Sequence, residues 1–257
     1  MKILAIGDVT SPTGASHLEK KLWSIRKQYG IDFCVVNGEN ASFITGISRD
    51  GAEKLLRSGA DVITGGNHTL HNNSAHAMLE EVPEVLRPVN FGDAAPGHGY
   101  VVVNTGAYRI LVINAMGNVH IEPQLDMPYS YIEEALERES GNYDFAVLDI
   151  HAEATGEKLA VAHSFDGKIN VIFGTHTHVP TADATVLPKG SGYISDVGMC
   201  GESGGILGME VSSVLFKMRT KLPGKFKCAS GAPVADAVIF TLDDASGRVE
   251  SIKRIKF

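Results

Sequence analysis

Five short apolar runs of this sequence are followed by polar residues whose side chains can bind a metal ion. The runs are followed by Asp8, by Glu39-Asn40, by Asn67-His68, by His151, and by His176 together with His178. Carboxylate oxygens, amide oxygens and imidazole nitrogens are ligands of first-row divalent metals. Ligands of open α/β sheets bind beyond the carboxyl ends of the strands, so we expect these side chains to gather at one edge. The pattern predicts a metal site there.

Each of these residues, taken alone, also has an ordinary structural role. Asp8 fits a helix N-cap, Asn67 fits a turn, and a single buried histidine such as His151 is often a hydrogen-bonded core residue. The pair of His176 and His178 favours metal binding, because residues two apart in an extended chain point to the same side. A surface position is expected for Lys158, the nearest basic residue to His151.

The elements that must position these residues are strands alternating with helices. Strands are expected over 3–6, 33–36, 62–64, 145–150 and 170–173, helices over 16–29, 49–58, 130–139 and 157–164, and antiparallel pairs within 101–114 and 234–257. This order predicts an α/β fold with a mixed sheet or two packed sheets. With no repeat or linker, residues 1–257 are predicted to form a single domain. The Pro- and Gly-rich stretch 87–99 opens a predicted lid or insertion at about 87–130.

Composition excludes several classes of protein. The chain has 257 residues, 44% of them hydrophobic and 21% charged, which excludes a disordered or fibrous protein. Its net charge of −7 argues against long duplex nucleic acid as a partner. The three cysteines are too few and too scattered for a disulfide framework. No signal peptide and no membrane-spanning run is apparent, so the cytoplasm is the expected compartment and no membrane partner is expected.

Several motifs carry a resemblance to a known family. They are Asn37-Gly38-Glu39-Asn40, Gly66-Asn67-His68-Thr69, His151-Ala152-Glu153-Ala154-Thr155, the run Gly174–His178, and Asp196-Val197-Gly198-Met199. Together they resemble the YmdB family of phosphodiesterases, within the calcineurin-like metallophosphoesterase superfamily, from residue 3 to about residue 210. The resemblance implies an αββα sandwich of two mixed sheets flanked by helices, with a two-metal site at one end.

The resemblance also implies a role for each candidate residue. One ion would be held by Asp8, Glu39, Asn40 and His178, and the other by Glu39, Asn67, His151 and His176, with Glu39 bridging the two. A hydroxide that bridges the ions would attack phosphorus, as in other two-metal sites. His68 would be the general acid that protonates the leaving oxygen. A donor set rich in oxygen favours iron or manganese, with zinc and magnesium as alternatives.

The implied function is hydrolysis of cyclic nucleotides, either 2′,3′ or 3′,5′, or of similar small phosphodiesters. Two alternatives stay open: a phosphomonoesterase or nucleotidase on the same scaffold, and a catalytically silent metal-binding regulatory protein. The family suggests a homo-oligomer. Where relatives commonly have Trp-Asp and Gln-Gly-Arg, this chain has Leu70-His71 and Met116-Gly117-Asn118. The residues that bind the substrate therefore stay unassigned.

Overall fold

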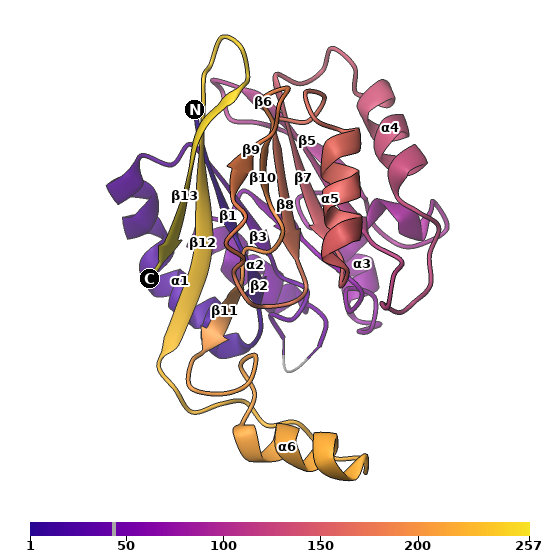
Figure 1. The fold of residues 1–257 in the computed structure, drawn as a ribbon, viewed down its shortest axis with the longest axis vertical. Coiled ribbons are helices and arrows are strands. Elements are labelled where there is room, and N and C mark those ends of the chain that lie inside the picture. Colours follow the sequence, from indigo (N-terminus) through magenta and orange to yellow (C-terminus); the bar gives the residue numbers. More distant parts are fainter. Residues whose placement is uncertain (43–44) are drawn as a thin grey trace.

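The computed structural model describes residues 1–42 and 45–257, which form two β-sheets packed face to face (Figure 1). The first sheet has the order β2 (Asp8–Val9), β11 (Met199–Glu202), β12 (Pro233–Leu242), β1 (Lys2–Ile6), β3 (Phe33–Asn37), β4 (Val62–Thr64), with β13 (Val249–Lys256) also paired to β12. The second has the order β5 (Tyr100–Asn104), β6 (Arg109–Met116), β7 (Phe145–His151), β8 (Val171–Thr175), β10 (Gly192–Ile194), β9 (Thr185–Val186).

The described part of the chain has six helices, of which five cover the outer faces of the two sheets. They are α1 (Pro12–Tyr29), α2 (Arg49–Ser58), α3 (Ala75–Glu81), α4 (Tyr129–Arg138), α5 (Thr155–Ser164) and α6 (Val211–Thr220), with a short 3₁₀ turn at Val89–Phe91. The first three cover the first sheet, and α4 and α5 cover the second. Helix α6 lies apart, at the end of the molecule to which β11 leads (Figure 1).

Alternation along the strands divides the apolar residues into three layers. In β1, Leu4 and Ile6 face the cluster beneath α1, α2 and α3, whereas Ile3 faces the cluster between the two sheets. In β7, Val147 joins that central cluster and Leu148 joins the one beneath α4 and α5. Successive residues of a strand point to opposite faces, so a strand that is apolar throughout must be covered on both. The layers confirm the predicted αββα sandwich of two mixed sheets.

Local sequence signals set the ends of the helices that precede the site. The side chain of Ser11 accepts a hydrogen bond from the Gly14 amide and caps α1, and Ser48 caps α2 in the same way. Both helices end at a glycine in the left-handed region, Gly30 with φ 64° and Gly59 with φ 108°. Glycine has no Cβ to clash there, so each helix stops at a defined residue and the chain enters the next strand.

The predicted elements are present within a few residues of their expected bounds, including both antiparallel pairs, now seen as β5–β6 and β12–β13. Residues 100–116 of the range predicted as a lid or insertion form β5 and β6. The sequence analysis missed α3 and α6 and the short strands β2, β9, β10 and β11. None of the helices in the described part of the chain is long and apolar enough to span a membrane.

Candidate metal centre

The candidate ligands lie at the carboxyl ends of strands from both sheets. Strands β1, β3 and β4 are parallel neighbours in the first sheet, and β6, β7 and β8 are parallel neighbours in the second. The side chain of Asn37 at the end of β3 donates to the Asp149 carboxylate in β7 over 3.0 Å, so these ends of the two sheets meet. The structure thus brings all seven predicted ligands to one end of the sandwich.

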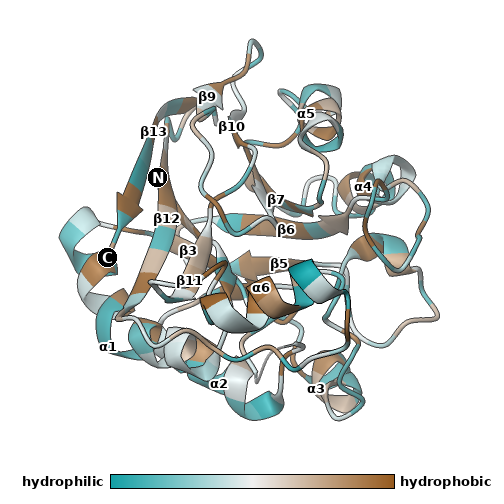
Figure 2. Cartoon of the chain, turned by 60° about the horizontal axis from the view of Figure 1, so that its bottom comes forward, coloured by the Kyte–Doolittle hydropathy of each residue, from teal (hydrophilic) through white to brown (hydrophobic). Residues whose placement is uncertain are grey.

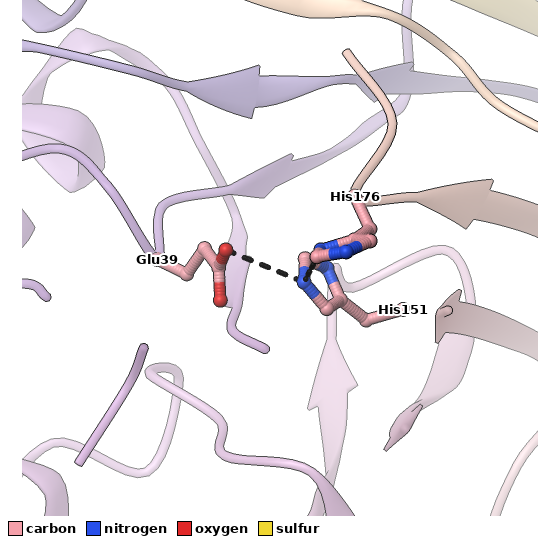
Figure 3. Close-up of side chains that lie close together, drawn as sticks. All are labelled: Glu39, His151 and His176. Atoms are coloured by element: carbon pink, nitrogen blue, oxygen red, sulfur yellow. Dashed lines mark hydrogen bonds and ion pairs between the residues drawn. The ribbon is translucent and has the colours of Figure 1, made fainter. Parts of the chain in front are cut away.

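His151 is the point on which the surrounding ligand groups converge (Figure 3). Its Nε2 atom lies 3.1 Å from Nδ1 of His176, 3.3 Å from Oε1 of Glu39 and 3.1 Å from Oδ1 of Asn67. Ligand atoms of Glu39, His151 and His176 all lie within 4.8 Å of one another. Gly66 makes this approach possible, because a Cβ there would lie 2.3 Å from both the Glu39 carboxylate and the His151 ring.

A buried hydrogen-bond chain sets the tautomer of His151. The hydroxyl of Thr175 donates to Oδ1 of Asp149 over 2.7 Å and lies 2.9 Å from Nδ1 of His151. Its single proton is committed to the carboxylate, so the hydroxyl oxygen accepts from His151 Nδ1–H. The lone pair of neutral His151 then lies on Nε2, which faces two acceptor oxygens, from the Glu39 carboxylate and the Asn67 amide, and also Nδ1 of His176. A proton or a bound cation at Nε2 relieves the contact between its lone pair and the two acceptor oxygens.

The other half of the site centres on Asp8, which is buried at the start of β2. Its Oδ2 accepts from the His176 amide over 3.1 Å, and its Oδ1 lies 3.6 Å from Nε2 of His178. Among the residues that the structure describes, three buried polar atoms around Asp8 have no hydrogen-bond partner: Oδ1 of Asp8, Oδ1 of Asn40 and Nδ1 of His178. Buried polar atoms are rarely left without a partner. Oxygen and imidazole nitrogen atoms are common ligands of divalent metal ions. Their position here, unpaired and beside two carboxylates, fits the coordination of such ions.

The two histidines after β8 reach the site by a route that the sequence analysis did not predict. An extended segment was expected, but His176 has φ 99° and His178 has φ 64°, both in the left-handed region. Residues other than glycine occupy this region at a cost of about 1–3 kcal/mol, and they do so mostly at functional sites. The prediction of an extended pair was wrong. The backbone turns at each histidine so that one ring meets His151 and the other meets Asp8.

The charges of the cluster shift its pKa values strongly. Burial by itself lowers the pKa of His151, but the carboxylates of Glu39, Asp8 and Asp149 together outweigh burial and raise this pKa to about 9. Burial raises the pKa of Asp8, but His178, His151 and the His176 amide together outweigh burial, so the pKa falls below its usual range. Burial, reinforced by His151, lowers the pKa of His176 to about 4. Without metal ions, the buried carboxylates are compensated by protons on imidazole.

His68 lies beside the cluster, half-buried in the wall of the cavity above it. Its backbone amide donates to Oε2 of Glu39 over 3.0 Å, and its Nδ1 lies 3.1 Å from Nδ1 of His71. Burial lowers the pKa of the His68 imidazole. Nε2 of the ring lies 3.4 Å from Nδ2 of Asn67, and among the described residues the ring makes no hydrogen bond to Glu39, His151 or His176, so it can also contact a ligand in the cavity.

The sequence analysis missed the residues that support the ligands. Lys158, expected on the surface, is buried, and its Nζ donates to the Thr175 carbonyl over 2.7 Å and to the Asp196 carboxylate over 3.0 Å. Asp196 also accepts from the Thr177 amide over 2.9 Å. The pair of Lys158 and Asp196 therefore holds the backbone between the two site histidines. The surface prediction was wrong; the helical spacing that puts Val161 and Lys158 on one face of α5 was the available signal.

The sandwich and this cluster of carboxylate, amide and imidazole groups define an enzyme of the metallophosphoesterase class. The family model for YmdB-like proteins matches residues 4–255, so the chain belongs to the YmdB-like family. A 2′,3′-cyclic-nucleotide 2′-phosphodiesterase of Bacillus subtilis is 37% identical over 99% of this chain and 96% of that protein.

Solved structures agree with this assignment. A hypothetical protein from Thermus thermophilus superposes with a TM-score of 0.92 at 36% identity, over 100% of this chain and 99% of the other. A structure described as a novel phosphatase from Mycoplasma pneumoniae superposes with a TM-score of 0.92 at 30% identity, over 100% and 93%. The fold and the metal-binding class predicted from the sequence are confirmed.

Proposed function

We propose that this chain is a dinuclear metal-dependent phosphodiesterase that hydrolyses small cyclic phosphodiesters, with 2′,3′-cyclic nucleotides as the first candidates and 3′,5′-cyclic nucleotides as the second. The observation that carries the proposal is the convergence on Nε2 of His151, which faces a carboxylate, an amide oxygen and a second imidazole. The name of the Bacillus subtilis relative supports the choice of 2′,3′-cyclic nucleotides.

The seven candidate ligands divide into two sets that share one carboxylate. Asp8, Glu39, Asn40 and His178 would hold one ion, and Glu39, Asn67, His151 and His176 the other. The set holds four oxygen ligands and three nitrogen ligands and no thiolate, which favours iron or manganese. When bound, such ions act as Lewis acids toward the phosphoryl oxygens.

The chain's own residues would orient the substrate and move its proton. His68 lines the cavity beside Asn40, His176 and His178. A phosphate held at the ligand cluster would place its leaving oxygen within reach of this ring, and His68 would donate the proton that the leaving alkoxide needs. The fixed Nδ1–H of His151 keeps that ring in one orientation while the substrate is bound.

The test is turnover by the purified protein, loaded with Mn²⁺ or Fe²⁺, of 2′,3′-cyclic AMP, 3′,5′-cyclic AMP, bis-p-nitrophenyl phosphate and p-nitrophenyl phosphate in parallel. We expect metal-dependent cleavage of the diesters in preference to the monoester. Cleavage of the monoester alone would replace the proposal by the phosphomonoesterase alternative. Bound metal without turnover of any of the four would favour the regulatory alternative.

A further inference from the structure

The cavity above the ligand cluster has one side that is entirely apolar. Its volume is about 510 Å³, and its floor includes Asn40, His68, His176 and His178. The opposite side, here called the apolar wall, consists of Ile206, Leu207, Met209, Val214, Met218 and Phe226. All six come from α6 and the segments on either side of it. A ligand that fills this cavity must therefore be polar at one end and apolar at the other.

The fold holds the apolar wall in a defined position over the site. Ile206 and Met209 pair as a tight turn, and Met209 also bridges to Cys228 across the base of the α6 segment. The Glu210 amide donates to the Lys227 carbonyl over 2.7 Å, which ties the two ends of the segment together. The turn presents Leu207, with φ 52°, toward the cavity. The wall is thus built before a ligand arrives.

The wall is part of an unusual concentration of exposed apolar side chains. Ten large hydrophobic residues are exposed in the described chain, and five of them lie between residues 207 and 222: Leu207, Val211, Phe216, Met218 and Leu222. Figure 2 shows apolar residues along α6 where it lies across the end of the molecule. Exposed apolar surface gathered beside a polar site indicates a ligand-binding surface.

We propose that the apolar wall binds the base of a nucleoside phosphate whose phosphate lies at the ligand cluster. This inference rests on the proposed function and adds the part of the substrate that the metal ligands do not recognise. No lysine or arginine is among the described residues that line the cavity, so the cavity does not suit a ligand with several phosphates. One phosphate at the ions and one planar apolar group against the wall match the two sides.

Met218 and Phe226 provide the contacts for the planar group; Nζ of Lys217 lies 4.4 Å from the centroid of the Phe226 ring and covers one face, so the base would stack on the other. Every base has an aromatic face that stacks on aromatic side chains, largely independently of sequence, and the methionine thioether packs favourably against aromatic rings. The six side chains of the wall carry no hydrogen-bonding group that could read the edge of a base. We therefore expect purine and pyrimidine nucleotides to bind alike, with purines somewhat tighter because they have more area to stack.

The test compares two variants of the wall with a control on α6. Phe226→Ala and Met218→Ala each remove a wall side chain. Successive helical residues are turned by about 100°, so Phe216 lies about 160° around α6 from Met218, and it does not line the cavity. Phe216→Ala removes an equally large exposed ring and serves as the control. Binding of adenosine 3′-monophosphate and of inorganic phosphate to the Mn²⁺-loaded proteins is measured by calorimetry.

For adenosine 3′-monophosphate we expect the affinity to fall about 10-fold in Phe226→Ala and by a smaller factor in Met218→Ala, while the control keeps the wild-type affinity. Inorganic phosphate should bind all four proteins alike, because it does not reach the wall. In turnover by the wall variants, KM for 2′,3′-cyclic AMP should rise at least about fivefold more than KM for glycerol 1,2-cyclic phosphate, which has the same cyclic diester and no base.

Three results would overturn the inference. Wall variants that bind the nucleotide as the wild type does would show that the base lies elsewhere. An equal loss in Phe216→Ala would show a general effect on α6. A change of oligomeric state in sedimentation, with nucleotide binding intact, would show that the wall contacts a second copy of the chain. If the wild type hydrolyses neither cyclic substrate yet binding depends on the wall, the proposed function fails and the inference stands.

Discussion

Replacing Thr175 by valine tests whether the buried hydrogen-bond chain controls metal binding. The substitution preserves the size and branching of the side chain and removes only its hydroxyl. That hydroxyl donates to Asp149 over 2.7 Å and accepts from Nδ1 of His151 over 2.9 Å. Without it, the Nδ1–H of His151 has no partner, and the ring can turn or change tautomer. The lone pair on Nε2 is then no longer held toward Glu39 and His176.

The size of the effect follows from the contacts that are lost. One buried polar group left without a partner costs about 1–3 kcal/mol, so the two groups left here should lower the free energy of unfolding by about 2–6 kcal/mol. For a chain of 257 residues this corresponds to a fall of about 4–24 °C in the melting temperature. Loss of a hydrogen bond behind a metal-ligating histidine typically weakens metal affinity about 10–100-fold.

Thr64→Val is the matched control, because Thr64 donates to the other oxygen of Asp149 over 2.5 Å and makes no contact with His151. Metal content after dialysis against a competing chelator, measured by mass spectrometry, and thermal unfolding give the two readouts. Both variants should lose stability, and only Thr175→Val should lose metal affinity. Equal metal affinity in the two variants, or full affinity in Thr175→Val, would refute the assignment of the His151 tautomer.

Three further predictions concern the proposed metal ligand Asp8, the proposed proton donor His68, and the proton that His151 carries in the metal-free protein. Asp8→Asn should lower metal content, since it removes an anionic ligand; unchanged content after dialysis would show that Asp8 is not one. His68→Ala should keep its metal and lose about 10²–10⁴-fold in kcat; metal loss would place His68 among the ligands instead. His151, with a pKa raised to about 9 in the metal-free protein, is protonated at neutral pH, so metal must displace that proton. Metal affinity should therefore rise with pH up to about 9, with at least one proton released at about pH 7.5. Calorimetry in buffers of different ionisation enthalpy would disprove this by finding no proton released.

The positions of the strands could be predicted because the residues within and just after each strand are typical of a buried strand. Runs such as Phe33–Asn37 are largely apolar and are followed by glycine and then by polar residues, which is typical of a strand buried on both faces that ends at a site. Parallel strands run in the same direction, so their carboxyl ends lie at one edge of the sheet. The sequence spacing alone therefore predicts that the ligands lie together at that edge. The short strands β2 and β11 lack this signal, because the strands that pair with them are distant in the sequence.

The sequence by itself therefore determined which residue types stand at the ends of the strands. Those residue types in turn determined the class of chemistry. This was possible because the apolar runs and the polar residues that follow them are local features of the sequence. Only the tertiary structure decided how the site works. The left-handed turns at His176 and His178, the burial of Lys158 against Asp196, and the hydroxyl of Thr175 between Asp149 and His151 depend on segments far apart in the chain. The physical reason is that burial and hydrogen bonding to distant groups override the local preferences of these residues, and no local pattern records those partners.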